Sequence, residues 1–166
     1  MSLRAIVLAA GRGTRMKVDR PKVLFPVAGR PLLHWVLDAV AGAGPHETWV
    51  VVGHGAAEVQ AALPRGVGAV LQEPQLGTGH AVMVALEAMG DVGGDTILIV
   101  PGDTPLLRSA TLEGLVAARG KAPASLLTVV MPDPAGYGRV VRAAGKVTGI
   151  VEHRDATPEQ RRDGPR

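Results

Sequence analysis

The chain has 166 residues, a formal net charge of +3, no cysteine and only 2% aromatic residues. Its length is usual for one domain, and 46% apolar with 20% charged residues is the composition of a globular protein. The absence of cysteine excludes disulfides, thiolate metal sites and thiol catalysis. No apolar run approaches the roughly 20 residues of a membrane-spanning helix, and the first residues lack a signal-peptide pattern, so we expect a cytoplasmic protein that binds no membrane.

The positive charge is concentrated near the amino terminus. Residues 1–30 contain seven basic side chains and one acidic side chain, which gives this segment a charge of +6 and leaves −3 for the remainder. The basic residues are Arg4, Arg12, Arg15, Lys17, Arg20, Lys22 and Arg30. Because aromatic residues for base stacking are almost absent, we expect this patch to bind a phosphorylated small molecule and not nucleic acid.

Apolar strands and amphipathic helices alternate over residues 4–118. The continuous apolar run at 4–10 is typical of a strand buried on both faces, as in parallel sheets. Pro31 then starts a helical repeat that Gly42 and Gly44 end. Further strands are predicted at 48–52, 67–71 and 96–100, and further helices at 56–63, 78–89 and 110–118. The pattern predicts an α/β fold, with a Rossmann-like, mostly parallel sheet flanked by helices.

The pattern changes after residue 124. Three strands separated by turns, at 125–131, 138–142 and 147–151, follow one another without a helix, which predicts a mixed edge of the sheet. We therefore expect one core at residues 1–151. Residues 152–166 contain eight charged residues and one aliphatic side chain, Ala156, so we expect them to be a polar, mobile segment.

In an open α/β sheet, ligands bind beyond the carboxyl ends of the strands, so the residues after each predicted strand are the candidates. Gly11 and Gly13 follow the first strand and let backbone N–H groups approach an anion, while Arg15 and Lys22 supply positive charge. The third glycine of a dinucleotide-binding motif and the Gly-Lys-Ser/Thr of a P-loop are absent. Such a turn is more often an ordinary strand-to-helix connection, but the adjacent charge favours a phosphate site.

Two further candidate segments follow the third and fourth strands. The Gln72 amide can read the edge of a base, and the Gly77-Thr78 turn offers N–H groups and a hydroxyl at a helix start, although Thr78 is equally well interpreted as an N-cap. We interpret His80 as structural. Asp103 suits Mg²⁺, which takes one or two protein oxygens and completes its octahedron with phosphate and water, and the alternative is a turn or cap residue.

Four motifs in this order resemble the sugar nucleotidyltransferases. LAAGRGTRM, followed by Pro21-Lys22-Val23-Leu24, resembles the signature loop of that superfamily. QLGTGHA, DPAGYGR and GKVTGIVEHRDAT resemble the uridyltransferase domain of the bacterial bifunctional enzymes that make UDP-N-acetylglucosamine, a precursor of peptidoglycan and lipopolysaccharide. The resemblance covers residues 6–162 and implies a nucleotide-diphospho-sugar transferase fold.

The resemblance implies a role for each candidate residue. Leu8, Ala9, Ala10 and Gly11 would line the uridine and phosphate site, Arg15 and Lys22 would neutralise the triphosphate, Gln72, Gly77 and Thr78 would hold uracil, Asp103 would bind the catalytic Mg²⁺, and Gly138 and Glu152 would contact the amino sugar. The implied reaction is uridylyl transfer from UTP to N-acetylglucosamine-1-phosphate with release of pyrophosphate. Without the resemblance, Gly138 and Glu152 would be interpreted as a hairpin turn and a solvated strand edge.

The chain departs from the family in two respects. Pro101 stands before Gly102-Asp103, where these enzymes often carry an aromatic or small residue. The family's domain also continues with an Asn-Thr-Gly segment that contacts the sugar and a later Asn that completes the metal site, and an acetyltransferase half follows; none of these is in the sequence, so we expect an incomplete domain. Two alternatives therefore stay open: a nucleotide-binding fragment of weak activity, and a nucleotidyltransferase with another base or acceptor. An uncovered sheet edge also predicts self-association.

Overall fold

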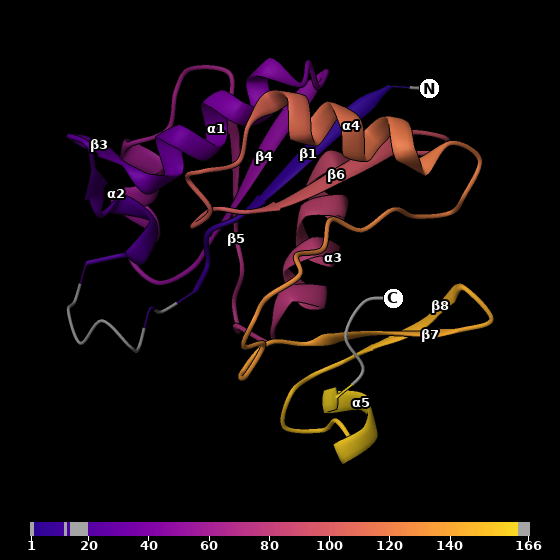
Figure 1. Ribbon diagram of the computed structural model, residues 1–166. Helices are drawn as coiled ribbons and strands as arrows, with labels where there is room; N and C mark the ends of the chain where they lie inside the picture. Colours follow the sequence, from indigo (N-terminus) through magenta and orange to yellow (C-terminus); the bar gives the residue numbers. More distant parts are fainter. Residues whose placement is uncertain (1, 12, 14–19, 163–166) are drawn as a thin grey trace. The chain divides into compact units, whose positions relative to one another are not determined.

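The computed structural model describes residues 2–11, 13 and 20–162 of the chain. The chain divides into two compact units, Met1–Ser125 and Leu126–Arg166. Figure 1 shows that the first unit contains a central sheet with helices and the second contains a hairpin with a short helix.

A four-stranded parallel sheet is the centre of the first unit. Its strands are β1 (Leu3–Leu8), β4 (Glu47–Val52), β5 (Gly68–Leu71) and β6 (Thr96–Pro101), in the order β5-β4-β1-β6. Ile6 of the central β1 lies opposite Trp49 of β4 and Ile99 of β6. All the pairings in this sheet are parallel, which confirms the mostly parallel sheet predicted from the continuous apolar runs.

Helices cover both faces of this sheet. α1 (Leu32–Gly42), α2 (Ala56–Ala61) and α4 (Ser109–Arg119) contribute to the same buried cluster as Ala5 and Val7 of β1, whereas α3 (Thr78–Met89) packs with Ile6. Successive residues of a strand point to opposite faces, so β1 serves both clusters. Figure 1 shows α1 and α4 on one side of the sheet and α3 on the other. Among the helices of the described residues, none is both long and apolar enough to cross a membrane.

A short hairpin follows η2 (Lys22–Leu24), where the sequence predicts only a loop. Its strands are β2 (Pro26–Val27) and β3 (Arg30–Pro31). The Trp35 indole N–H donates to the Val27 carbonyl at 3.0 Å, and the Arg30 guanidinium lies 4.7 Å from the centre of a Trp35 ring. Arg30 also pairs with Asp38 at 2.8 Å. Side chains of α1 therefore hold the hairpin in place.

The second unit contains an antiparallel hairpin of β7 (Arg139–Ala143) and β8 (Lys146–Val151). These strands form a sheet of their own, so they add no antiparallel edge to the four-stranded sheet. The strand predicted at 125–131 is wrong, because none of these residues belongs to a strand. Four of its apolar side chains are half or more exposed: Leu126, Leu127, Val129 and Val130. A strand-prone segment needs a neighbouring strand to satisfy its backbone hydrogen bonds, and no strand of the described residues pairs with this one.

The polar segment after residue 151 contains a short helix, α5 (Pro158–Arg162), which its composition does not predict. Thr157 and Gln160 form a capping box at its start: the Thr157 hydroxyl accepts a hydrogen bond from the Gln160 N–H, and Gln160 Oε1 accepts one from the Thr157 N–H. Ala156, the one aliphatic side chain of the segment, is only 5% exposed. Local capping and burial of this methyl group therefore give the segment structure.

Arg4 connects the amino ends of three strands. Its guanidinium pairs with Glu47 at the start of β4 and, at 2.6 Å, with Asp95 just before β6. The backbone N–H of Ser2 also donates to Asp95, at 2.8 Å. The Ser2 N–H and the Arg4 guanidinium lower the pKa of Asp95, and the hydrogen bond to Asp95 raises the pKa of Arg4. The charges at this end of the sheet are thus used to join the strands.

We predict that Asp95→Asn lowers the melting temperature at neutral pH. A carboxyl whose pKa is lowered by folding stabilises the folded state above its unfolded pKa of about 3.9, and that stabilisation is lost as the pH falls through the folded value. Melting curves of wild type and variant should therefore differ at neutral pH and converge below about pH 4. Asp38→Asn, in the more exposed pair with Arg30, is the control and should change the melting temperature little. An equal effect of both substitutions would contradict the prediction.

Candidate active site

The carboxyl ends of the four parallel strands meet at one edge of the sheet. Backbone hydrogen bonds continue the pairing there: the Gly102 N–H donates to Leu8, the Ala9 N–H to Val51, and the Gln72 N–H to the Val52 carbonyl, at 2.8–2.9 Å. The loops after β6, β1, β4 and β5 therefore follow one another along this edge, in the order of the strands. This is the edge at which open α/β sheets bind ligands.

Lys22 and Asp103 form an ion pair at this edge, with 2.7 Å between Nζ and Oδ2. Lys22 is held by its neighbours Val23 and Leu24, which are buried in the core. Asp103 is held by Gly102, where an added Cβ would lie 3.4 Å from the Val23 side chain. The two charged side chains remain 43% and 37% exposed, so they are fixed in position and still accessible to a ligand.

The glycine-rich loop lies against Lys22. Gly13 has a φ of +58°, and an added Cβ there would come 3.1 Å from the Lys22 Cβ. Gly11 is exposed, and among the described residues other than its chain neighbours none comes within 4 Å of the position of an added Cβ. Arg15, predicted to neutralise phosphate together with Lys22, lies outside the described residues, as does Arg12.

A second polar group lies in the loop between β5 and α3. The Gln72 side chain is buried, with 4% exposure, and its Nε2 donates to the Gly77 carbonyl at 2.9 Å. Gly77 precedes α3 with a φ of +101°, a conformation that strains any residue with a Cβ. The interpretation of Thr78 as an N-cap is wrong: Gly77 holds that position, and Thr78 is the exposed first residue of the helix.

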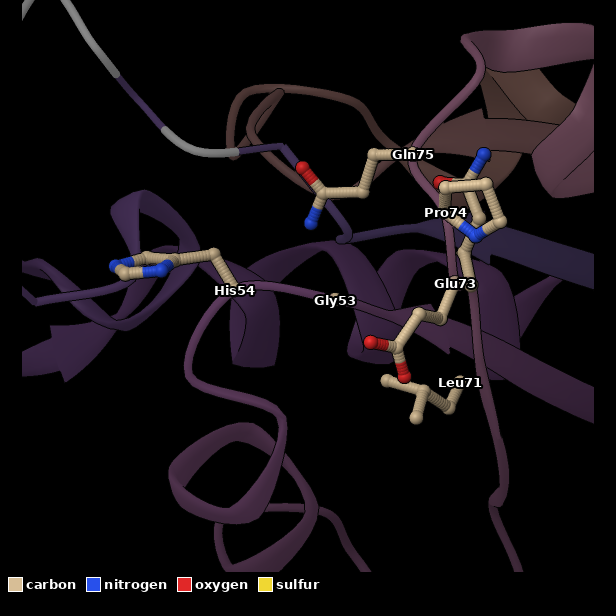
Figure 2. Close-up of a pocket in the computed structure, with 7 residues that line it drawn as sticks. Gly53, His54, Leu71, Glu73, Pro74 and Gln75 are labelled. Atoms are coloured by element: carbon tan, nitrogen blue, oxygen red, sulfur yellow. The ribbon is translucent and has the colours of Figure 1, made fainter.

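An open pocket of about 330 Å³ lies between the loops after β4 and β5. Gly53 and His54 line it on one side and residues 71–75 on the other. Figure 2 shows the side chains of Leu71, at the end of β5, and of Glu73 and Gln75, in the loop that follows, extending toward the Gly53-His54 segment. Gln72, the residue predicted to read a base, is therefore one of the residues that line this pocket.

Ala9 and Ala10 have buried side chains, 2% and 7% exposed, that belong to the two core clusters. Leu8 is partly buried against the cluster around α3. These three residues can therefore offer a ligand little besides their backbone, and of residues 8–11 Gly11 is the exposed one.

Gly138 and Glu152 lie together at the open end of the β7–β8 hairpin in the second unit. Arg139 pairs with Val151, so the residues just outside this pair face each other. An added Cβ at Gly138 would lie 3.9 Å from a Glu152 carboxylate oxygen. The two residues predicted to contact the sugar are thus neighbours in space.

The positive patch is smaller than the charge count predicts. Arg4 is engaged with acidic residues at the opposite end of the sheet, and Arg30 is paired with Asp38 and covers Trp35. Composition counts these charges as one group because they are close in sequence, whereas β1 separates Arg4 from the loop by its own length.

Three residues at this edge were given no role in the site by the sequence prediction: Gly53, Gln75, which begins the QLGTGHA motif, and His80, which was interpreted as structural. Gly53 directly follows a predicted strand, so the rule that selected the other candidates also selects it. Gln75 lies within the loop between two predicted elements, and its importance depends on its proximity to Gly53. His80 lies 3.2 Å from Gln72 Nε2, through its Nδ1, and this contact cannot be derived from the spacing of the two residues.

Residues 5–159 match the MobA-like NTP transferase domain, and the chain belongs to this family of nucleotidyltransferases. It is similar to the bifunctional protein GlmU of Paracidovorax citrulli, with 54% identity over 166 residues that cover 96% of this chain and 35% of that protein. The resemblance inferred from the four motifs is confirmed. The chain spans 34–36% of the length of the curated relatives that it matches.

Two solved structures share this fold. Rv0371C of Mycobacterium tuberculosis, in complex with manganese, is 28% identical with a TM-score of 0.59, and the match covers 71% of this chain and 59% of that one. UDP-glucose pyrophosphorylase complexed with UDP-glucose is 18% identical with a TM-score of 0.71, and the match covers 92% of this chain and 69% of that one. These likenesses confirm the predicted nucleotide-diphospho-sugar transferase fold.

We predict that Gly53→Ala destabilises the protein by about 1–3 kcal/mol, the usual cost of overpacking. A Cβ at residue 53 would lie 2.4 Å from Gln75 Nε2 and 2.7 Å from the Ala10 carbonyl oxygen, and this backbone atom can move only with the chain after β1. Gly114→Ala is the control, because that position lies within α4 and has open space around it. It should stabilise by about 0.5–1 kcal/mol. Urea unfolding measures both values, and a neutral Gly53→Ala would show that the loops do not pack as described.

Proposed function

We propose that the chain transfers uridylyl from UTP to N-acetylglucosamine-1-phosphate and releases pyrophosphate. The observation that carries this proposal is the Lys22–Asp103 ion pair, 2.7 Å long, at the same sheet edge as the Gln72–Gly77 loop. The Lys22–Asp103 pair suits phosphate and a divalent cation, and the Gln72–Gly77 loop suits a base. Membership in the NTP transferase family and the similarity to GlmU support the proposal.

The residues around Asp103 suit a magnesium ion that is shared with a nucleotide. Mg²⁺ takes one or two protein carboxylates and fills its remaining positions with phosphate and water. Asp103 offers one carboxylate, and the described residues contain no group of three or more acidic or histidine side chains that would enclose a metal fully. We infer that Asp103 would hold the ion. When bound, it would neutralise charge on the triphosphate and polarise its oxygens.

The reaction needs positioning and positive charge more than proton transfer. A phosphate oxygen of N-acetylglucosamine-1-phosphate attacks the α-phosphorus of UTP in line, the bond from this phosphorus to the bridging oxygen breaks, and pyrophosphate leaves with the electron pair. The nucleophile is an anion at neutral pH, so no general base is required. Lys22, together with Arg15, would reduce the repulsion between the two anions, and the Gly11-Gly13 backbone would donate to the phosphates.

The two ends of the substrates would be held by different groups. Gln72, Gly77 and Thr78 would contact uracil, whose N3–H is a donor between two acceptor carbonyls. Leu8, Ala9 and Ala10 would contribute their backbone beside the nucleotide. In the second unit, the Glu152 carboxylate and the Gly138 backbone would bind hydroxyl and amide groups of the amino sugar.

We predict that Lys22→Ala and Asp103→Ala each lower the rate of pyrophosphate release at least about a hundredfold, with UTP, Mg²⁺ and N-acetylglucosamine-1-phosphate as substrates. Their melting temperatures should change little, because a half-exposed ion pair contributes only about 0–1 kcal/mol. Asp38→Ala is the matched control: it also breaks a single exposed ion pair, but away from this edge, and should leave turnover unchanged.

Three outcomes would contradict the proposal in different ways. Activity near wild type in either variant would show that the substituted residue, Lys22 or Asp103, has no role in the reaction. Release of pyrophosphate at equal rates from UTP, CTP, GTP and dTTP would exclude uridine selection. Binding of UTP by calorimetry without any release would leave a nucleotide-binding function in place of transfer.

A further inference from the structure

The Gln72 amide has one orientation that satisfies its neighbours. The Gly77 carbonyl can only accept a hydrogen bond, so the amide nitrogen of Gln72, and not its oxygen, must face it at 2.9 Å. The same nitrogen lies 3.2 Å from Nδ1 of His80. Because the nitrogen has two hydrogens and no acceptor lone pair, His80 Nδ1 must be the acceptor, and the imidazole proton is on Nε2. Both amide hydrogens are therefore used within the protein.

This orientation matters for base choice. A glutamine amide turned by half a revolution exchanges a donor for an acceptor at nearly the same positions. Because both amide hydrogens are used, Gln72 can offer a base only its oxygen, which is an acceptor. Uracil and cytosine differ at N3, where uracil carries an N–H donor and cytosine carries an unprotonated acceptor nitrogen. An amide free to turn would accommodate both bases, whereas a fixed amide distinguishes them.

His80 is the partner that can keep the amide fixed when a nucleotide binds. The Gly77 carbonyl is shared, because it also accepts a hydrogen bond from the Ala81 N–H at 3.1 Å. His80 is half-buried in the first turn of α3, and the residues by which α3 enters the core are Ala81 and Ala85. Its imidazole thus contributes a hydrogen bond to Gln72 while other residues anchor the helix.

We propose that His80 is a positioning residue that sets the preference for uracil by holding the Gln72 amide in one orientation. The proposal rests on the function proposed above, in which Gln72 reads the base. His80 acts through Gln72 and needs no contact with the nucleotide.

The test is calorimetric binding of UTP and CTP, with Mg²⁺, to the full chain and three variants. His80→Leu removes the acceptor and should lower the UTP-over-CTP affinity ratio about tenfold, the effect of one hydrogen bond. His80→Asn places an amide oxygen near the position of Nδ1 and should restore most of the ratio. His34→Leu, which removes another helix-borne histidine with one hydrogen bond, to the Ala62 carbonyl, is the control and should leave the ratio unchanged.

A fourth measurement separates positioning from direct contact. In a Gln72→Ala background, His80→Leu should change the ratio no further, because the residue through which His80 acts is gone. A further loss there would overturn the proposal in favour of a direct contact between His80 and the base. An unchanged ratio in His80→Leu, with a wild type that prefers UTP, would overturn this proposal and leave the proposed function standing. If the wild type binds UTP and CTP equally well, both the uracil assignment of the proposed function and the role proposed for His80 are refuted.

A spectroscopic readout keeps the proposal testable if His80→Leu does not fold. Nitrogen–proton correlation spectra of the ¹⁵N-labelled wild-type chain report which imidazole nitrogen carries the proton. The His80 ring should carry it on Nε2 and leave Nδ1 unprotonated. A proton on Nδ1 of the neutral ring would exclude acceptance from Gln72 and overturn the proposal.

Discussion

The hydrogen bond from the Gly102 N–H to the Leu8 carbonyl is the constraint on which the carboxyl edge depends. It continues the pairing of β1 with β6 beyond Pro101, and a side chain at residue 102 would meet the same carbonyl oxygen at 3.0 Å. Glycine permits this approach and also the contact with Val23. The turn after β6 is therefore fixed beside η2, and Asp103 reaches Lys22 as a consequence of backbone pairing and not of attraction between the two charges alone.

The two ends of the sheet use charge differently. At the amino end, Arg4 joins Glu47 and Asp95, and each of these side chains is at most 30% exposed. At the carboxyl end, Lys22 and Asp103 form a separate ion pair whose side chains are more exposed. Water screens an exposed pair, so exchanging one partner for a phosphate or a cation costs little. The first arrangement suits stability, and the second suits a site whose ions change during a reaction.

Much of the first unit was predictable because its local signals agree. The limits of α3 match the prediction at both ends, since Gly77 and Gly90 bracket an amphipathic segment. The range 125–131 has the apolar composition of a strand, but strand formation requires a partner that composition cannot specify. For α5, the high charge of the segment led to the prediction that it has no structure. The spacing of Thr157 and Gln160, however, is that of a capping box, a local signal for a helix start.

The sequence predicted which residues belong to the candidate site, but it predicted few of the contacts between them. The rule that ligands bind after parallel strands selects Lys22's loop, Gln72 and Asp103, because it depends on topology alone. Whether two of these residues touch depends on how the loops turn. Gln72 and His80 are eight positions apart, across a loop and a helix start, and they meet because Gly77 adopts a positive φ that redirects the chain into α3. The residue that fixes the Gln72 amide is therefore determined by one backbone angle, which explains why its role becomes visible only in three dimensions.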